Sequence, residues 1–117
     1  MKLHLPTFFE VVDSGDITAL VEFLTEDAVF RYGSQPPVTG RAAIHAYLTA
    51  LKSPTVSHHE VLHTWKRDDS LVVQGEVTLK SPKGTDLRLP FVDVFHLRQK
   101  KIYDYRIYID PTPLFMG

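Results

Sequence analysis

One carboxyl group stands in an otherwise apolar row of alternating residues, and it is the first candidate for chemistry. The row runs through Leu87, Leu89, Phe91, Asp93, Phe95 and Leu97. Because side chains of a strand alternate between two faces, all six point to one side of a sheet. A carboxyl group buried without a partner keeps its proton. Asp93 is therefore predicted to act as a general acid or hydrogen-bond donor, with Tyr32 or His59 as a weaker candidate partner.

Two other interpretations of Asp93 are open at this point. A neighbouring tyrosine or backbone N–H donates to it, and the residue only organises the core. Alternatively, a β-bulge near Pro90 reverses the alternation and turns Asp93 outward.

A second pattern, His59-Glu60-Val61-Leu62-His63, matches the H-E-x-x-H motif of zinc proteases. That chemistry needs a helix, which brings both imidazoles to one face for a shared zinc ion. The local sequence favours a strand, because Val61, Thr64 and Trp65 are good strand formers. On a strand the two histidines would stand about 13 Å apart, too far for one metal ion. We therefore expect no metal site here, and the protease reading is the weakest alternative.

The elements that must position these residues change character along the chain. Apolar residues of helical spacing predict helices over 5–12, 17–24 and 41–51, with Asp16 as the N-cap of the second. A short strand is predicted over 28–32. From Val56 onward the period is two, which predicts strands over 56–66, 71–79, 87–97 and 103–109. Helices followed by consecutive antiparallel strands indicate an α+β fold.

Composition excludes several classes of protein. The 117 residues predict one domain, 1–117, and 44% hydrophobic with 23% charged residues is typical of a globular chain. A formal net charge of −1 gives no sign of a nucleic-acid or membrane partner. The absence of cysteine excludes disulfides and thiol catalysis. No G-x-S-x-G motif supports a serine hydrolase. The N-terminus does not read as a signal peptide, so a cytoplasmic location is expected.

The order of these elements, together with several short motifs, resembles the SnoaL-like branch of the nuclear-transport-factor-2-like superfamily. The matching segments are Gly15-Asp16, 24–30, Gly40 to Ile44, 89–95 and 101–110. The resemblance implies a cone-shaped α+β barrel, with three N-terminal helices packed on a curved, mainly antiparallel, cystatin-like sheet. It also implies an apolar pocket between helices and sheet, for which we expect, besides Asp93, the lining residues Phe8, Phe30, Arg31, Phe91, Phe95, Tyr105 and Ile107.

Ketosteroid isomerase, another member of the superfamily, uses three functional residues, and only one of them has the same residue type at the matching position of this sequence. The oxyanion tyrosine falls at Phe8, the base aspartate at Arg31 (or at Phe30 or Tyr32), and the proton-holding aspartate at Asp93. Ketosteroid isomerisation by that mechanism is therefore not expected. The terminal-strand aspartate of the epoxide hydrolases falls at Ile107.

The resemblance thus predicts a small-molecule pocket protein. One hypothesis is a cofactor-independent isomerase, cyclase, dehydratase or hydrolase that acts on a small apolar or polyketide-like substrate. The alternative is a non-catalytic binder or accessory subunit that uses the same pocket. The other face of the Asp93 strand carries Val92 and Val94, so apolar residues stand on both faces of the sheet. One face is expected to be covered by the helices and the outer face by a second copy of the chain, which predicts a homodimer.

Overall fold

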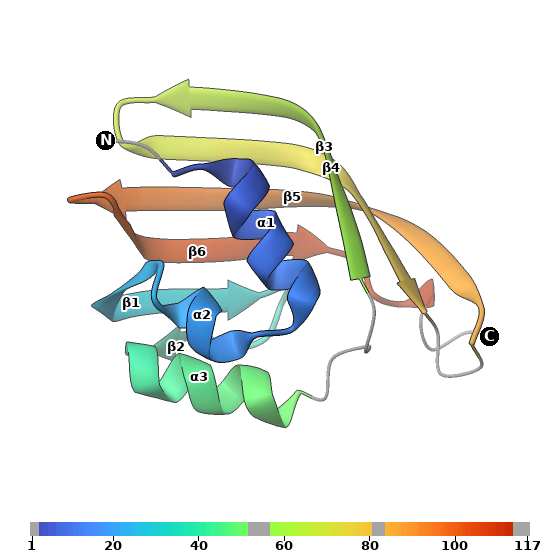
Figure 1. The fold of residues 1–117 in the computed structure, drawn as a ribbon, viewed down its shortest axis with the longest axis horizontal. Helices are drawn as coiled ribbons and strands as arrows, with labels where there is room; N and C mark the ends of the chain where they lie inside the picture. The colour runs from blue at the N-terminus through green and yellow to red at the C-terminus, as the bar shows by residue number, and fades with distance from the viewer. Residues whose placement is uncertain (1–2, 52–56, 81–83, 114–117) are drawn as a thin grey trace.

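The computed structural model describes residues 3–51, 57–80 and 84–113. Its helices are α1 (Leu5–Ser14), α2 (Ile17–Val21) and α3 (Arg41–Ala50). Its strands are β1 (Leu24–Tyr32), β2 (Val38–Thr39), β3 (Ser57–Arg67), β4 (Ser70–Lys80), β5 (Asp86–Arg98) and β6 (Lys101–Ile109). The α+β fold expected from the sequence is confirmed (Figure 1). None of the three helices has the length and hydrophobicity of a membrane-spanning segment.

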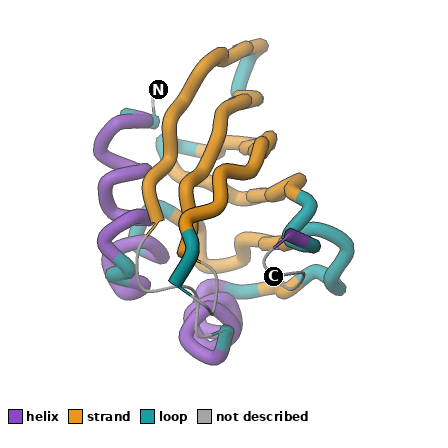
Figure 2. Tube along the Cα trace, turned by 90° about the vertical axis from the view of Figure 1, so that its right-hand side faces the viewer, coloured by secondary structure: helices purple, strands orange, loops and turns teal. Residues whose placement is uncertain are grey.

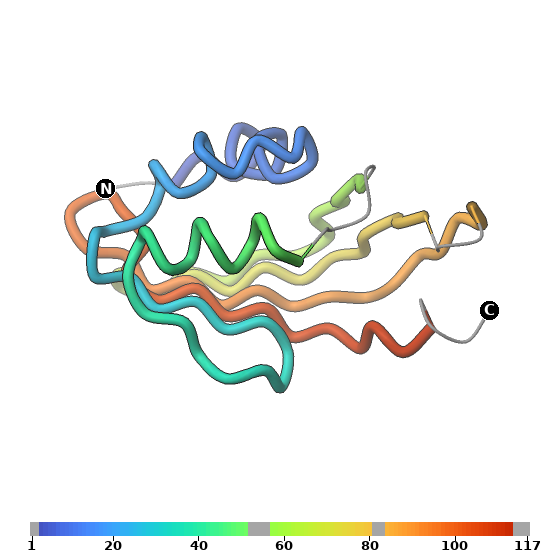
Figure 3. Tube along the Cα trace, turned by 90° about the horizontal axis from the view of Figure 1, so that it is seen from below, coloured from blue at the N-terminus to red at the C-terminus, as the bar shows by residue number. Residues whose placement is uncertain are grey.

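The six strands form one sheet in the order β2-β1-β6-β5-β4-β3. Neighbouring strands are antiparallel except β1 and β6, which run parallel. The sheet is curved and mainly antiparallel, as the resemblance implied. It is not closed, and β2 and β3 are its edge strands. All three helices lie on one face of this sheet, as the two rotated views show (Figures 2 and 3).

Local sequence explains where α1 and α2 begin and end. The His4 side chain caps α1 by accepting from the Thr7 backbone N–H, and Gly15 ends the helix in the left-handed region, at φ 76°. The predicted N-cap is confirmed: Asp16 accepts from the Ala19 N–H at 3.0 Å. Between these two caps the chain changes direction from α1 into α2. The C-terminal end of α1 lies over the concave face of the sheet (Figure 3).

One prediction about the N-terminal half is wrong, and one strand there was not predicted. The second helix was expected to reach Leu24, but α2 ends at Val21 and Leu24 begins β1. Leu24 is 1% exposed and packs in the core as a strand residue, so its helical spacing from Leu20 was coincidental. The sequence also gave no sign of β2, whose two residues pair with Val29 and Phe30. The predicted start of the third strand, Val56, lies outside the described residues.

The core beneath the helices is rich in aromatic rings. Phe8 is fully buried and contacts Phe9, Phe23, Phe95 and Tyr105, with ring centroids 5.2–5.7 Å apart. Edge-to-face pairs of this kind stabilise a core by about 0.5–1.5 kcal/mol each beyond their buried area. This cluster anchors α1 to β5 and β6, and it therefore fixes the last turn of α1 relative to the strands that carry Asp93.

Candidate active site

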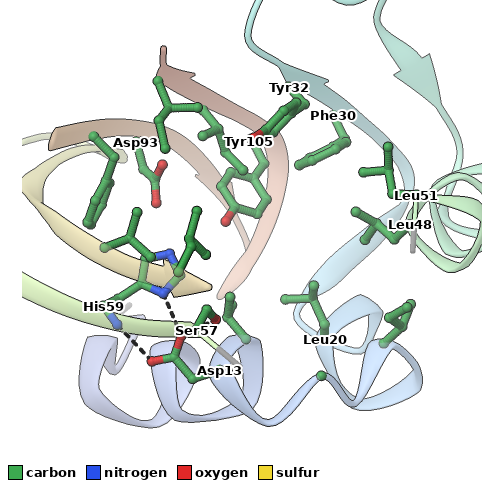
Figure 4. A pocket seen from close by; sticks show the side chains of 18 of the residues that line it. Asp13, Leu20, Phe30, Tyr32, Leu48, Leu51, Ser57, His59, Asp93 and Tyr105 are labelled. Carbon is green, nitrogen blue, oxygen red and sulfur yellow. Dashed lines mark hydrogen bonds and ion pairs between the residues drawn. The ribbon is translucent and has the colours of Figure 1, made fainter. Parts of the chain in front are cut away.

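A cavity of about 410 Å³ lies between the helices and the concave face of the sheet (Figure 4). Its apolar walls come from α1, α2, α3 and all the strands of the sheet except β2. Among the residues that line it are Val12, Asp13, Leu20, Phe30, Tyr32, Leu48, Leu51, Ser57, His59, Val77, Phe91, Asp93, Tyr105 and Ile107. A volume in the lower part of the roughly 300–1,000 Å³ range suits a small ligand.

Asp93 lies in the middle of β5 with its carboxyl group facing this cavity. It is 2% exposed, and its strand neighbours are Val73 on β4 and Ile107 on β6. Its Oδ1 has no hydrogen-bond partner among the described residues. Burial alone raises the pKa of Asp93 well above its ordinary value. A protonated Asp93 presents an O–H donor to a ligand.

The sequence left the alternation around Asp93 open, and the structure resolves it. β5 pairs with β4 in one unbroken register from Lys80↔Asp86 to Ser70↔His96. The alternative of a bulge near Pro90 is therefore wrong, and Asp93 shares the buried face with Phe91 and Phe95.

A second carboxyl group, Asp13, faces the same cavity from the last turn of α1. Its Oδ1 accepts from the Ser57 hydroxyl at 2.8 Å and lies 2.5 Å from His59 Nδ1. Its Oδ2 accepts from the His59 backbone N–H at 3.0 Å. A carboxylate is unfavourable at the C-terminal end of a helix dipole. The three donors on β3 offset that cost and hold Asp13 against the strand.

The contact with Asp13 fixes the tautomer and orientation of His59. Because a carboxylate only accepts, His59 Nδ1 must carry the proton in this contact. The ring packs against Phe9 and Phe91, each with centroids 5.1 Å away. Burial is the larger influence and lowers the pKa of His59, while Asp13 opposes this shift. A neutral ring then offers the lone pair of Nε2, which points away from Asp13 toward the side of the cavity where Asp93 lies (Figure 4).

Two tyrosines complete the polar groups at the cavity wall. Burial raises the pKa of Tyr32, and it raises that of Tyr105 well above the usual range, with a further contribution from Asp93. Both phenols therefore keep their protons at neutral pH and are hydrogen-bond donors. The Tyr105 ring stacks on Phe95 at 4.8 Å, and its hydroxyl points into the cavity (Figure 4).

Residues 6–105, most of the chain, match the SnoaL-like domain family. The chain belongs to the SnoaL-like family. This result agrees with the family resemblance of the sequence.

Solved structures of similar fold come from proteins with several activities. The chain is 27% identical to SalBIII, an epoxide hydrolase/cyclase-like enzyme of pyran ring formation in the polyether salinomycin, with a TM-score of 0.77 over 92% of this chain and 88% of that one. It is 18% identical to TerC, co-crystallised with polyporic acid, with a TM-score of 0.81 over 95% and 92% of the chains. An LEH-like epoxide hydrolase from M. tuberculosis is 14% identical, with a TM-score of 0.76 over 95% and 83%. The last two likenesses show the shared fold alone.

Of the residues expected around the SnoaL-like pocket, the structure places seven at the cavity and three elsewhere. At the cavity are Phe30, Tyr32, His59, Phe91, Asp93, Tyr105 and Ile107. Phe8 and Phe95 lie in the closed aromatic core behind the wall, each 0% exposed. Arg31 has the opposite parity to Phe30 and Tyr32, so it lies on the outer face, where its Nε donates to the Gln35 carbonyl at 2.9 Å.

Sequence reasoning missed Asp13 and Ser57. Asp13 is four residues after Phe9, so it continues the apolar stripe of α1, and a carboxylate on that stripe was the available signal. Ser57 shares its parity with His59 on β3. No local pattern links either residue to His59, because Asp13 and His59 are 46 positions apart.

The H-E-x-x-H segment is a strand, as the sequence predicted. β3 runs through it, and a register shift between Val61 and His63 puts His63 opposite Gln74, on the outer face. His59 faces the cavity instead. In the described part of the chain, no three acidic or histidine side chains are grouped closely enough to hold a metal ion.

Proposed function

We propose that this SnoaL-like protein is a cofactor-independent acid–base enzyme for a small, mainly apolar substrate, of the isomerase, cyclase, dehydratase or hydrolase type. The observation that carries the proposal is that one cavity holds both a candidate base and a candidate acid. One is a histidine oriented by a carboxylate, and the other is a buried carboxyl group with an unpartnered oxygen. Burial lowers the pKa of His59 and raises that of Asp93, so the histidine is free to accept a proton while the carboxyl group keeps one to donate.

In this proposal the two groups act on different atoms of the substrate. His59 Nε2 removes a proton from a C–H or O–H group, while Asp13 and Ser57 are positioning residues that hold the ring. Asp93 donates a hydrogen bond or a proton to the oxygen that gains electron density, with the Tyr105 hydroxyl as a second donor. Removing a proton at one atom and stabilising charge at another serves enolisation, elimination and ring closure alike.

Proton exchange offers a test that does not need the natural substrate. Incubation with 2-tetralone in D₂O is expected to exchange the ketone's α-hydrogens for deuterium faster than buffer alone, measured by proton NMR. His59→Gln should remove the acceleration, whereas Glu10→Gln on the exposed side of α1 should leave it unchanged. Equal rates for the wild type and His59→Gln would contradict the proposal.

A non-catalytic binder with the same cavity is the alternative. It would bind 2-tetralone without accelerating exchange. The number of polar groups that converge on the cavity favours the enzyme, because a binder has no need for a histidine held by a carboxylate.

We also propose that the outer face of the sheet binds a second copy of the chain. Its register aligns Trp65, Val72 and Val94 in one row across β3, β4 and β5. Val92 pairs with Tyr108 in the neighbouring row. Trp65 and Tyr108 are 56% and 53% exposed, which is unusual for large apolar side chains. These residues form an apolar surface that a homodimer would cover.

Sedimentation velocity at micromolar concentration is expected to show a dimer. Val94→Asp should shift it to a monomer, because it buries a charge at the interface, while Gln35→Asp in an exposed loop should not. A wild-type monomer would contradict this proposal. The single-domain boundary 1–117, the cytoplasmic location and the absence of nucleic-acid partners stay predictions.

A further inference from the structure

The cavity has a polar end and an apolar end. Asp13, Ser57, His59 and Asp93 lie at the end bounded by α1, β3 and β5 (Figure 4). At the other end, Leu20 comes from α2, Leu48 comes from α3, and Leu51 is the residue that caps α3. A ligand that fills both ends therefore has its polar atoms at one extremity and hydrocarbon at the other.

The polar end of the cavity holds carboxyl groups but no described lysine or arginine side chain. Asp13 and Asp93 bring two carboxyl groups, and no described residue that lines the cavity is a lysine or arginine. The arginines of β1 and β6 lie on the outer face, where Arg106 pairs with Asp104 at 2.9 Å. On the same side of the sheet, Arg88 pairs with Glu60 and Glu76. The fold thus keeps these cations on the far side of the sheet from the cavity.

This distribution of charge penalises an anionic ligand. A carboxylate at the polar end would lose its hydration and meet two carboxyl groups without a described cation to compensate it.

A cationic ligand meets a different obstacle. Asp13 already accepts three hydrogen bonds from β3. A cation would therefore need Asp93 to ionise at a position that is 2% exposed and surrounded by apolar side chains. An uncharged oxygen avoids both costs, because it accepts from the Asp93 O–H and satisfies a buried group that otherwise has no partner at Oδ1.

We infer that the cavity selects an uncharged molecule of one or two rings, with an acceptor oxygen at Asp93 and hydrocarbon between α2 and α3, and rejects its carboxylate analogue. The inference shares one assumption with the proposed function, namely that the ligand binds in this cavity. Its size follows from the cavity volume of about 410 Å³. Aromatic side chains such as Phe30 and Phe91 provide flat walls for such rings.

Four naphthalene derivatives of similar size test the charge selection at pH 7 by calorimetry or ligand fluorescence. They are 2-acetylnaphthalene, 2-ethylnaphthalene, 2-naphthoate and 2-(aminomethyl)naphthalene. The ketone is expected to bind about tenfold or more tightly than either charged compound. Asp93→Leu should reduce the preference for the ketone over 2-ethylnaphthalene by about tenfold, because it removes the donor. Glu10→Gln, on the exposed side of α1, is the control and should change none of these affinities.

Orientation is tested with a variant at the apolar end. Leu48→Trp fills space between α2 and α3, so it should weaken binding of 2-acetylnaphthalene more than binding of the single-ring ketone acetophenone. Equal weakening of both would overturn the orientation.

The outcomes separate the two proposals. If 2-naphthoate or the amine binds as tightly as the ketone, the charge selection is overturned and the acid–base proposal stands. If no probe binds at millimolar concentration, the ligand cavity is contradicted, and the proposed function with it.

Discussion

The end of α1 and the middle of β5 each present an aspartate to the same cavity, in opposite surroundings. Asp13 receives three donors, from the Ser57 hydroxyl and from the ring and backbone of His59. Asp93 has an oxygen with no donor among the described residues and is surrounded by apolar side chains. The two residues have the same side chain, so their different roles come from position alone.

This difference shows how one cavity can hold a base and an acid at neutral pH. Asp13 accepts three hydrogen bonds from β3, and its carboxylate orients the His59 ring. Desolvation without donors favours the neutral form of Asp93. The helix end supplies a charge that positions a base, and the strand centre supplies a proton.

Removing the charge at the α1 end should have the largest effect. Asp13→Asn is expected to lower the rate of α-proton exchange about 100-fold or more, because the amide no longer fixes the tautomer of His59 with a carboxylate. Exchange kinetics by NMR measure it. Glu10→Gln, on the exposed side of the same helix, is the matched control and should leave the rate unchanged. A rate within twofold of the wild type for Asp13→Asn would show that the pair is only structural.

Replacing the aspartate of β5 with an apolar residue should make the fold more stable. Asp93→Leu completes the apolar row of β5 and removes a buried polar group, so the free energy of unfolding should rise by about 1–3 kcal/mol. Urea denaturation at pH 7 measures this change. Asp86→Leu, at the exposed end of β5, should not produce it. Destabilisation by Asp93→Leu of several kcal/mol would mean that Asp93 is held by a structural partner.

The stability of the wild type relative to Asp93→Asn should depend on pH. Since burial raises the folded-state pKa of Asp93 above the unfolded value near 3.9, the folded protein binds more protons between these two pKa values. The Asp93 contribution is therefore fully present below about pH 4 and is lost as pH rises through the folded-state pKa, by less than about 1.4 kcal/mol per pH unit. Urea titrations of both proteins from pH 4 to 8 measure the difference. A difference independent of pH would contradict the raised pKa.

The smallest effect is expected when one donor to Asp13 is removed. Ser57→Ala deletes the 2.8 Å hydrogen bond but leaves the two donors of His59. We expect a loss of about 0.5–1.5 kcal/mol in the free energy of unfolding and a severalfold decrease in exchange rate. Thermal unfolding and exchange kinetics measure the two effects. Loss of exchange as complete as in Asp13→Asn would contradict the division of roles between the three donors.

Local patterns were sufficient to predict most of the fold. The alternation from Leu87 to Leu97 predicted the face of Asp93, because strand parity depends only on neighbouring residues and β5 has no bulge against β4. Leu24 shows the limit, since its spacing from Leu20 fits a helix while its burial in β1 depends on the neighbouring strand β6.

The candidate site was only half predictable for the same reason. Asp93 was found from strand parity, and His59 was a weaker candidate within the H-E-x-x-H segment. The contact that orients His59 comes from a helix 46 residues earlier. Asp13 opposes the dipole of its own helix, so local rules disfavour it there. Such conflicts between local preference and position are expected at functional sites.

The central claim is that Asp93 holds a proton at a pH where ordinary aspartates are ionised. Carbon-13 NMR of the aspartate carboxyl carbons, with the Asp93 resonance assigned by its absence in Asp93→Asn, tests the claim directly. The account predicts that this resonance titrates with a midpoint well above the ordinary aspartate pKa of about 3.9, because burial raises the pKa of Asp93. Titration of Asp93 with a midpoint near 3.9 would contradict it.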